Sequence, residues 1–121
     1  NYYFEFDPVD GQIPYDLFLR ECDADKVAME IDVFWMVKGG GDPVKYMERY
    51  PGRFPMLHVK DMGPAPKHEM LDVGQGTINW KKILEAGRNG GVRHVFVEND
   101  EAANPLASIR TSFEYLHKLR Y

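Results

Sequence analysis

The stretch that decides the fold of this 121-residue chain is residues 56–61, which read MLHVKD. Apolar Leu57 and Val59 alternate there with His58 and Lys60, so an extended backbone gives this stretch one apolar face and one ionisable face. Strands of an open doubly wound sheet are covered by helices on both faces and read as nearly continuous apolar runs. The alternation therefore favours a strand that packs against helices on one face only.

Three further segments show the same alternation, and each carries an ionisable residue near its C-terminal end. Together with the first segment they predict strands at residues 2–6, 27–34, 56–59 and 94–98. Helix signals follow the strands, among them a proline at or near three helix starts, with Asp42 or Asn104 just before two of these prolines. The predicted helices span residues 14–22, 43–50, 80–88 and 106–119.

A βα unit repeated about four times predicts parallel strands joined by right-handed crossovers. The ionisable residues fall at the C-terminal ends of the strands, where the active sites of (β/α)8 barrels lie. We therefore predict an α/β fold in which residues 1–121 form a single partial domain, equivalent to half of a (β/α)8 TIM barrel. Because the chain starts inside a predicted strand, we expect a fragment whose open edges are covered by a missing N-terminal half-barrel or by a second copy.

The composition argues against several kinds of partner. The net charge is −4 and the sequence has no run of Lys or Arg, so we expect no nucleic-acid partner. No stretch approaches the roughly 18 apolar residues of a membrane-spanning helix, so we expect no membrane partner. The single cysteine, Cys22, excludes an intrachain disulfide and fits the cytoplasmic location that we expect.

Each predicted strand ends in a side chain that can bind a metal ion: Glu5, Asp32, His58 and Glu98. A single such residue is more often a cap or part of a salt bridge, but four at matching positions are not readily explained in that way. Three carboxylates and an imidazole at one barrel mouth need a cation, and this ligand set without thiolate suits Mn²⁺, Mg²⁺, Co²⁺ or Zn²⁺. Such an ion polarises a carbonyl, while carboxylates move protons at the neighbouring carbon.

Three polar neighbours of these residues have other expected roles. Lys60 shares the face of His58 one step nearer the mouth, so it either contacts a substrate oxygen or enolate, or pairs with a neighbouring carboxylate. Glu30 is expected one layer below Asp32, as a buried structural partner that lies too deep to meet the same ion. Asp61 is expected to cap a loop.

Three segments resemble consecutive strand motifs of the xylose-isomerase-like barrel superfamily: EIDVFW at residues 30–35, LHVKD at 57–61 and FVEND at 96–100. Three others are similar to members described as sugar phosphate isomerases/epimerases: GGGDP at residues 39–43, YPGRFP at 50–55 and GQGTINW at 74–80. The resemblance covers nearly the whole chain as the fifth to eighth βα units, which implies the C-terminal half of the barrel.

The resemblance also implies that three residues correspond to metal ligands of the family: Asp32, His58 and Glu98. Tyr2 stands where related sequences commonly have a histidine ligand, so the fourth ligand is either upstream of residue 1 or Glu5. Trp35 stands where the epimerases of the family have a substrate-binding histidine. It is therefore either an aromatic wall for a sugar or part of the core.

We predict a divalent-metal-dependent sugar isomerase or epimerase that moves a proton next to a metal-bound carbonyl. In this hypothesis Glu5, Glu98 and Lys60 are catalytic, and Trp35 and Lys60 bind the substrate. The alternatives are a lyase or dehydratase of keto-sugars or inositols, and an inactive or self-assembling half-barrel. An abasic-site endonuclease on the same fold is less favoured, because it usually needs a histidine-rich multi-zinc site and only His58 is placed for one.

Overall fold

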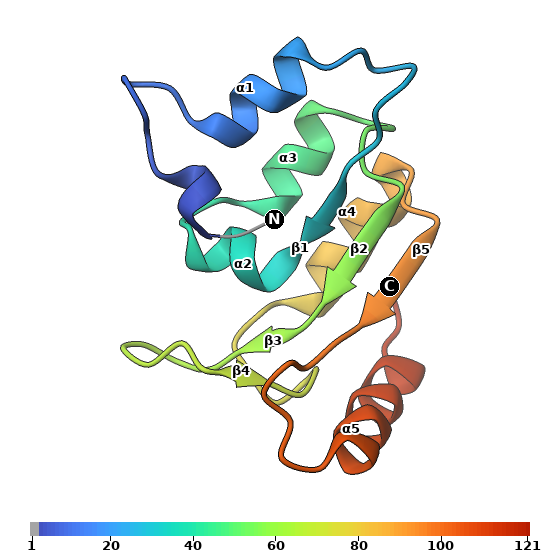
Figure 1. The fold of residues 1–121 in the computed structure, drawn as a ribbon. Helices are drawn as coiled ribbons and strands as arrows, with labels where there is room; N and C mark the ends of the chain where they lie inside the picture. Colours follow the sequence, from blue (N-terminus) through green and yellow to red (C-terminus); the bar gives the residue numbers. More distant parts are fainter. Residues whose placement is uncertain (1–2) are drawn as a thin grey trace.

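The computed structural model describes residues 3–121, which form helices and short strands (Figure 1). In chain order the elements are the 3₁₀ helix η1 (Tyr3–Phe6), α1 (Pro14–Glu21), β1 (Glu30–Asp32), α2 (Val33–Lys38), α3 (Pro43–Arg49), β2 (Met56–Val59), β3 (Asp61–Met62), β4 (Met70–Leu71), α4 (Trp80–Gly90), β5 (His94–Val97) and α5 (Pro105–Lys118). Within this described part, no helix is long and apolar enough to cross a membrane.

The centre of the fold is a parallel sheet with the strand order β1-β2-β5. The register places Ile31 of β1 beside Leu57 of β2. Ile31, Leu57 and Val59 are fully buried, and they share one core with Met47 of α3 and Ile83 of α4. Helices α3 and α4 pack against each other and cover the same side of the sheet (Figure 1). The predicted α/β class, with parallel strands that have one apolar face toward helices, is therefore confirmed.

Most predicted elements have the expected positions. Strand β2 spans the predicted residues, and the four predicted helices correspond to α1, α3, α4 and α5 with ends shifted by at most two residues. The side chain of Asp42 accepts hydrogen bonds from two N–H groups in the first turn of α3, and that of Asn104 accepts one in α5. Gly91 ends α4 at φ 92°, a left-handed conformation that glycine adopts without steric cost.

The predicted strand at residues 2–6 is wrong for the residues that the structure describes. Residues Tyr3–Phe6 form η1, after which the Asp7 N–H donates a 3.2 Å hydrogen bond to the Phe4 carbonyl. This tight turn buries Phe6, whose ring centroid lies 5.1 Å from that of Tyr15 and 6.0 Å from that of Tyr46. Local hydrogen bonds satisfy the backbone of a 3₁₀ turn, whereas a strand here would need a neighbouring strand.

The strand predicted at residues 27–34 is shorter than expected. It covers only β1, and α2 begins at the next residue because Asp32 is its N-cap. The Asp32 carboxylate accepts a 3.1 Å hydrogen bond from the Trp35 N–H. Phe34 is therefore buried in a helix rather than a strand, in a small cluster with Met62 and Met70. The cap signal of Asp32 was present in the sequence, but the apolar residues after it also fit a strand.

Strands β3 and β4 form an antiparallel pair that the sequence pattern does not predict. Asp61 of β3 holds the following loop, as expected of a cap, but it does so from a fully buried position. Its carboxylate accepts four hydrogen bonds, from the N–H groups of Met62, Gly74 and Ile78 and from the indole of Trp80. A Cβ atom at Gly76 would overlap this carboxylate, so the loop requires glycine there.

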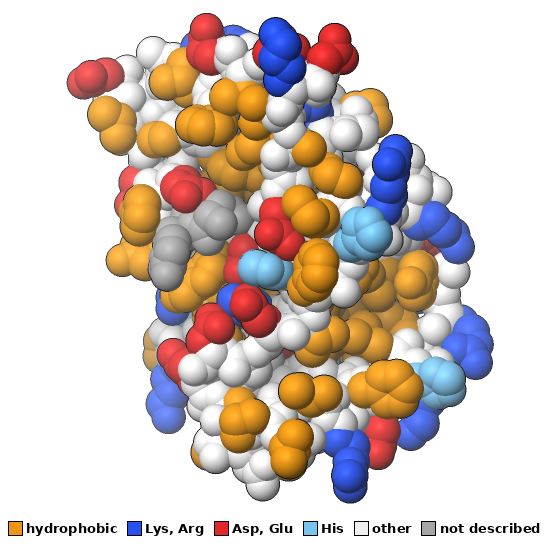
Figure 2. All heavy atoms as spheres, turned by 45° about the vertical axis from the view of Figure 1, so that its right-hand side comes forward, with side chains coloured by type: hydrophobic (Ala, Val, Ile, Leu, Met, Phe, Trp, Pro, Cys, Tyr) orange, Lys and Arg blue, Asp and Glu red, His pale blue; other side chains and the backbone are white. Residues whose placement is uncertain are grey.

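Apolar side chains are exposed on the side of the molecule that carries β5 and α5. Strand β5 pairs with β2 along one edge, and its apolar residues are 39% to 46% exposed. Figure 2 shows hydrophobic side chains gathered on the lower part of this face. The exposed apolar residues are Val95, Phe96 and Val97 of β5 and Leu106, Ile109 and Phe113 of α5. Exposed apolar patches of this kind commonly mark interaction surfaces.

Candidate metal centre

The polar face of the sheet brings together ionisable side chains from three strands. Asp32 of β1 lies beside His58 of β2 in the register. Glu98 directly follows β5 on the other side of β2, where its N–H donates a 3.1 Å hydrogen bond to the Val59 carbonyl. Alternate residues of a strand point to opposite faces, so Asp32 and His58 face away from the core that contains Ile31.

His58 contacts both carboxylates of this group with the same ring nitrogen. Its Nδ1 lies 3.6 Å from Asp32 Oδ2 and 3.4 Å from Glu98 Oε2. One ligand atom from each of the three residues lies within 4.8 Å of the other two. Figure 2 shows acidic, basic and histidine side chains gathered near the middle of this face. The structure thus brings together the three residues that the sequence singled out as ligands, and metal binding by them stays a prediction.

Lys60 lies among these carboxylates with a side chain that is only 3% exposed. Its Nζ is 2.6 Å from Glu98 Oε2, 3.0 Å from Asp100 Oδ2 and 3.1 Å from Asp32 Oδ2. Burial alone would lower the pKa of Lys60, but the hydrogen bonds to Glu98 and Asp100 and the charge of Asp32 outweigh burial and raise it. Of the two roles expected for Lys60, the salt bridge is present, and contact with a substrate stays a prediction.

Glu30 is not one of the three potential ligands, as expected, but it contacts His58 and is not buried. Glu30 Oε1 lies 3.4 Å from His58 Nε2, on the side of the ring opposite to Asp32. Glu30 and Asp32 are two residues apart in β1, which separates them by roughly 6.6 Å along the strand. The His58 ring contacts both of them because its two nitrogens face different carboxylates. The Glu30 side chain is also 31% exposed, so it is not buried as expected.

A hydrogen-bond network that no sequence pattern reveals holds the chain just after Glu98. Asp72 Oδ1 accepts a 2.7 Å hydrogen bond from the Asn99 side chain and a second one from the Ser108 hydroxyl. Asp72 thereby ties the residue that follows Glu98 to helix α5. The three partners come from different segments of the chain and have no motif spacing that could have identified them.

Glu5, predicted to be catalytic, lies in η1 rather than at the end of a strand. It is half-buried and lines a cavity together with Tyr15 and Glu30, so it lies near the carboxylate that contacts His58. It does not belong to the three-residue group around His58. Its catalytic role stays a prediction. Tyr2, which stands where related sequences have a histidine ligand, lies outside the described residues.

Trp35, predicted to bind substrate, is half-buried in α2. Its ring packs edge-on against Phe34 at a centroid distance of 4.8 Å, and Lys38 Nζ lies 4.9 Å from its centroid on an approach typical of cation–π contacts. Trp35 therefore contacts a small apolar cluster while part of its surface remains exposed. Binding of a sugar by this surface stays a prediction.

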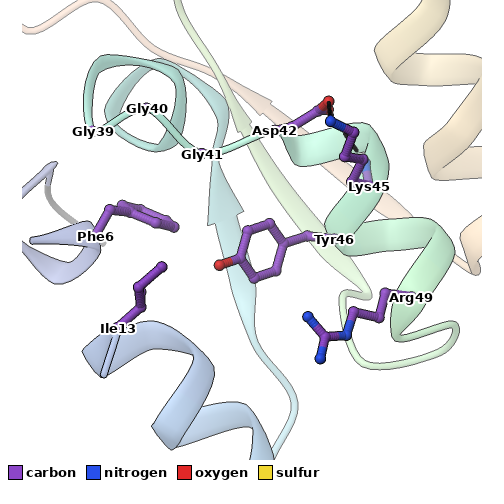
Figure 3. Close-up of a pocket in the computed structure, with 9 residues that line it drawn as sticks. All are labelled: Phe6, Ile13, Gly39, Gly40, Gly41, Asp42, Lys45, Tyr46 and Arg49. Atoms are coloured by element: carbon purple, nitrogen blue, oxygen red, sulfur yellow. Dashed lines mark hydrogen bonds and ion pairs between the residues drawn. The ribbon is translucent and has the colours of Figure 1, made fainter. Parts of the chain in front are cut away.

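A separate cavity of about 330 Å³ lies between η1 and α3 and is lined by Phe6, Tyr46 and the glycine loop before α3 (Figure 3). Two of its polar side chains already have partners within the protein. Lys45 Nζ is 3.4 Å from Asp42 Oδ2, and the Tyr46 hydroxyl donates a 2.6 Å hydrogen bond to Asp16. The residues of the metal-ligand group are absent from its lining, so this cavity is distinct from the candidate centre.

No protein-family model matches the chain, and neither does any curated protein. Solved structures do match it. A sugar phosphate isomerase/epimerase from Parabacteroides distasonis ATCC 8503 is 30% identical, with a TM-score of 0.81 over 98% of this chain and 44% of that chain. A second sugar phosphate isomerase/epimerase from the same organism is 33% identical, with a TM-score of 0.75 over 94% of this chain and 38% of that chain.

Over nearly its whole length, the chain is similar to proteins of the xylose-isomerase-like TIM barrel superfamily. A D-tagatose 3-epimerase-like protein, 23% identical with a TM-score of 0.62, has the same fold over 86% of this chain and 40% of its own. The chain thus spans less than half the length of the structures that it matches. The predicted half of a (β/α)8 barrel is therefore confirmed.

The residues at the centre fit the divalent ion that a xylose-isomerase-like barrel implies. Ligand atoms bound to one ion at roughly 2.1 Å lie about 3 to 4 Å apart, and both contacts of His58 Nδ1 fall in that range. Two carboxylates and an imidazole are suitable ligands for Mn²⁺, Mg²⁺, Co²⁺ or Zn²⁺. Glu30 at Nε2 supplies the carboxylate partner that metal-binding histidines commonly have on the other ring nitrogen.

Proposed function

We propose that the complete barrel is a divalent-metal-dependent sugar isomerase or epimerase. The observation that carries this proposal is the convergence of Asp32, His58 and Glu98 within 4.8 Å at the C-terminal ends of parallel strands. Active sites of barrel enzymes lie at this end of the strands. The names of the two similar structures from P. distasonis support a sugar as the substrate class.

The charge of the site supports a bound cation. Four carboxylates, those of Glu30, Asp32, Glu98 and Asp100, lie within salt-bridge distance of His58 or Lys60. Lys60 supplies only one positive charge against them. Asp32 is 3% exposed, so water screens its charge poorly. A divalent ion at His58 would offset most of the remaining negative charge.

The side chains of the site have complementary roles in this proposal. A divalent ion held by Asp32, His58 and Glu98 would polarise a substrate carbonyl and acidify the neighbouring C–H bond. Glu98, which is 39% exposed, and Glu5 would move the proton at that carbon. The Lys60 ammonium would stabilise negative charge on the substrate oxygen. The exposed part of Trp35 would pack against the apolar face of the sugar.

We also propose that this chain corresponds to the C-terminal half of the barrel, and that an N-terminal half-barrel covers β5 and α5. The chain matches only 38% to 44% of the length of the similar structures, and β5 and α5 together carry six exposed apolar residues. A small sugar would then bind at the mouth formed by both halves. A cytoplasmic location and the absence of nucleic-acid and membrane partners remain part of this proposal.

Deuterium incorporation tests the reaction directly. The complete protein is incubated with a panel of aldoses and ketoses in D₂O, with and without Mn²⁺, and the sugars are analysed by mass spectrometry. An isomerase or epimerase that exchanges the proton with solvent leaves one deuterium in the product, whereas the alternative lyase or dehydratase changes the mass by one water. Glu98→Gln should abolish incorporation and the exposed Glu101→Gln should retain it. Full activity without any divalent ion would contradict the proposal.

A further inference from the structure

Lys60 binds the same carboxylate oxygens that face His58. Its Nζ contacts Asp32 Oδ2 at 3.1 Å and Glu98 Oε2 at 2.6 Å. These two oxygens are also the ones that lie 3.6 Å and 3.4 Å from His58 Nδ1. A divalent ion shared by the three residues would therefore coordinate oxygens that already accept hydrogen bonds from an ammonium group.

The alternative oxygen of Asp32 is not equally available. Asp32 Oδ1 accepts the hydrogen bond from the Trp35 N–H that caps α2. Rotation of the Asp32 side chain to offer Oδ1 would break this cap, which costs about 1 kcal/mol in typical helices. Lys60 and a metal ion must therefore share Asp32 Oδ2, and their positive charges repel each other strongly at this distance because the site is poorly screened.

Asp100 offers Lys60 a place away from His58. Asp100 Oδ2 lies 3.0 Å from Lys60 Nζ, and its side chain is 53% exposed. Its contacts are with Lys60 and, through the backbone N–H, with Met70 Sδ at 3.1 Å. The carboxylate of Asp100 is not one of the three potential ligands. It can therefore retain the ammonium group when Asp32 and Glu98 turn to a metal ion.

We propose that Lys60 is a built-in cation that competes with the divalent ion, and that metal binding transfers its ammonium group from all three carboxylates to Asp100 alone. This inference rests on the proposed metal centre. In the metal-free protein, Lys60 offsets the charge of the buried Asp32 carboxylate and of Glu98. The cost of displacing it weakens metal affinity, so the occupancy of the centre responds to the concentration of the free divalent ion.

The test is the Mn²⁺ dissociation constant, measured by isothermal titration calorimetry on the purified protein and four variants. Lys60→Met should tighten Mn²⁺ binding by about tenfold or more, because the competing charge is gone. Asp100→Asn, at a position whose side chain is 53% exposed, should weaken binding because Lys60 loses the carboxylate that retains it when the ion binds. The exposed Lys81→Met is the matched control and should leave the constant unchanged.

The double variant Lys60→Met/Asp100→Asn separates the proposed transfer from simple charge effects. If Asp100 acts by receiving Lys60, Asp100→Asn should have no effect once Lys60 is absent. An equal loss of affinity in both backgrounds would overturn the transfer, and unchanged or weaker binding by Lys60→Met would overturn the competition. Absence of Mn²⁺ binding in the wild type and in every variant would instead overturn the proposed metal centre, and this inference with it.

Discussion

The carboxylate of Asp61 accepts a 2.8 Å hydrogen bond from the indole nitrogen of Trp80, which joins β3 to the first residue of α4. Both side chains are buried, at 0% and 1% exposure. Asp61 directly follows Lys60 in the sequence, so the loop that it anchors begins at the candidate metal centre. This hydrogen bond therefore connects the frame of the loop to the residues proposed to carry the chemistry.

Asp61→Asn should lower the free energy of unfolding by about 2 to 4 kcal/mol. The carboxylate accepts four hydrogen bonds through two oxygens, and an asparagine amide can offer only one oxygen while its NH₂ group faces donors. Urea denaturation followed by circular dichroism measures the change. The exposed Asp25→Asn is the control, and an equal effect of both substitutions would refute this structural role of Asp61.

Tyr15 and Tyr46 should respond in opposite directions to loss of their hydroxyl groups. The Tyr15 hydroxyl is buried and has no hydrogen-bond partner among the described residues, whereas the Tyr46 hydroxyl donates to Asp16 at 2.6 Å. Tyr15→Phe should therefore leave the unfolding free energy unchanged or raise it by up to about 1 kcal/mol, and Tyr46→Phe should lower it by about 1 kcal/mol. Denaturation midpoints check both values, and a clear loss of stability in Tyr15→Phe would show that its hydroxyl has a partner.

Glu30→Gln should weaken Mn²⁺ binding by about tenfold or more. The Glu30 carboxylate lies 3.4 Å from His58 Nε2 and would orient the ring so that Nδ1 faces the ion. Calorimetric titration gives the dissociation constant, with the exposed Glu48→Gln on α3 as the control. Equal affinity in Glu30→Gln and the wild type would mean that this contact does not orient the imidazole.

The exposed apolar residues of α5 should make the isolated chain associate. Ile109 and Phe113 are 59% and 61% exposed and lie on one side of the helix, where the missing half-barrel is proposed to pack. Size-exclusion chromatography of residues 1–121 should show concentration-dependent dimers or larger species, which Phe113→Asp should reduce. A folded monomer at every concentration would argue that this surface needs no partner.

The alternation of residues along the predicted strands supported both the fold class and the meeting of Asp32, His58 and Glu98, although it wrongly placed Glu5 at the end of a strand. Parallel strands in register place equivalent positions side by side. The face to which each residue of a strand points therefore decides which side chains converge. The helices were predictable because their prolines and caps, such as Asp42, act locally.

The features that the sequence did not predict depend on contacts between distant segments. The tight turn of η1 buries Phe6 against Tyr15 of α1 and Tyr46 of α3. The alternation of residues along a strand does not predict where these helices lie. Strands β3 and β4 are two residues each, too short for a periodic pattern. The contact between Glu30 and His58 was not predicted, because strand spacing alone ignores that the two imidazole nitrogens can face different carboxylates. The salt bridge between Lys60 and Asp100 could not be predicted, because Asp100 lies beyond a predicted strand.

Equilibrium binding of Mn²⁺ by the wild type and by His58→Asn is the most direct test of the proposed metal centre. We predict one ion per chain in the wild type, loss of that ion in His58→Asn, and its retention in His94→Asn, which replaces an exposed histidine at the start of β5. Binding of Mn²⁺ by His58→Asn with unchanged affinity would contradict the account.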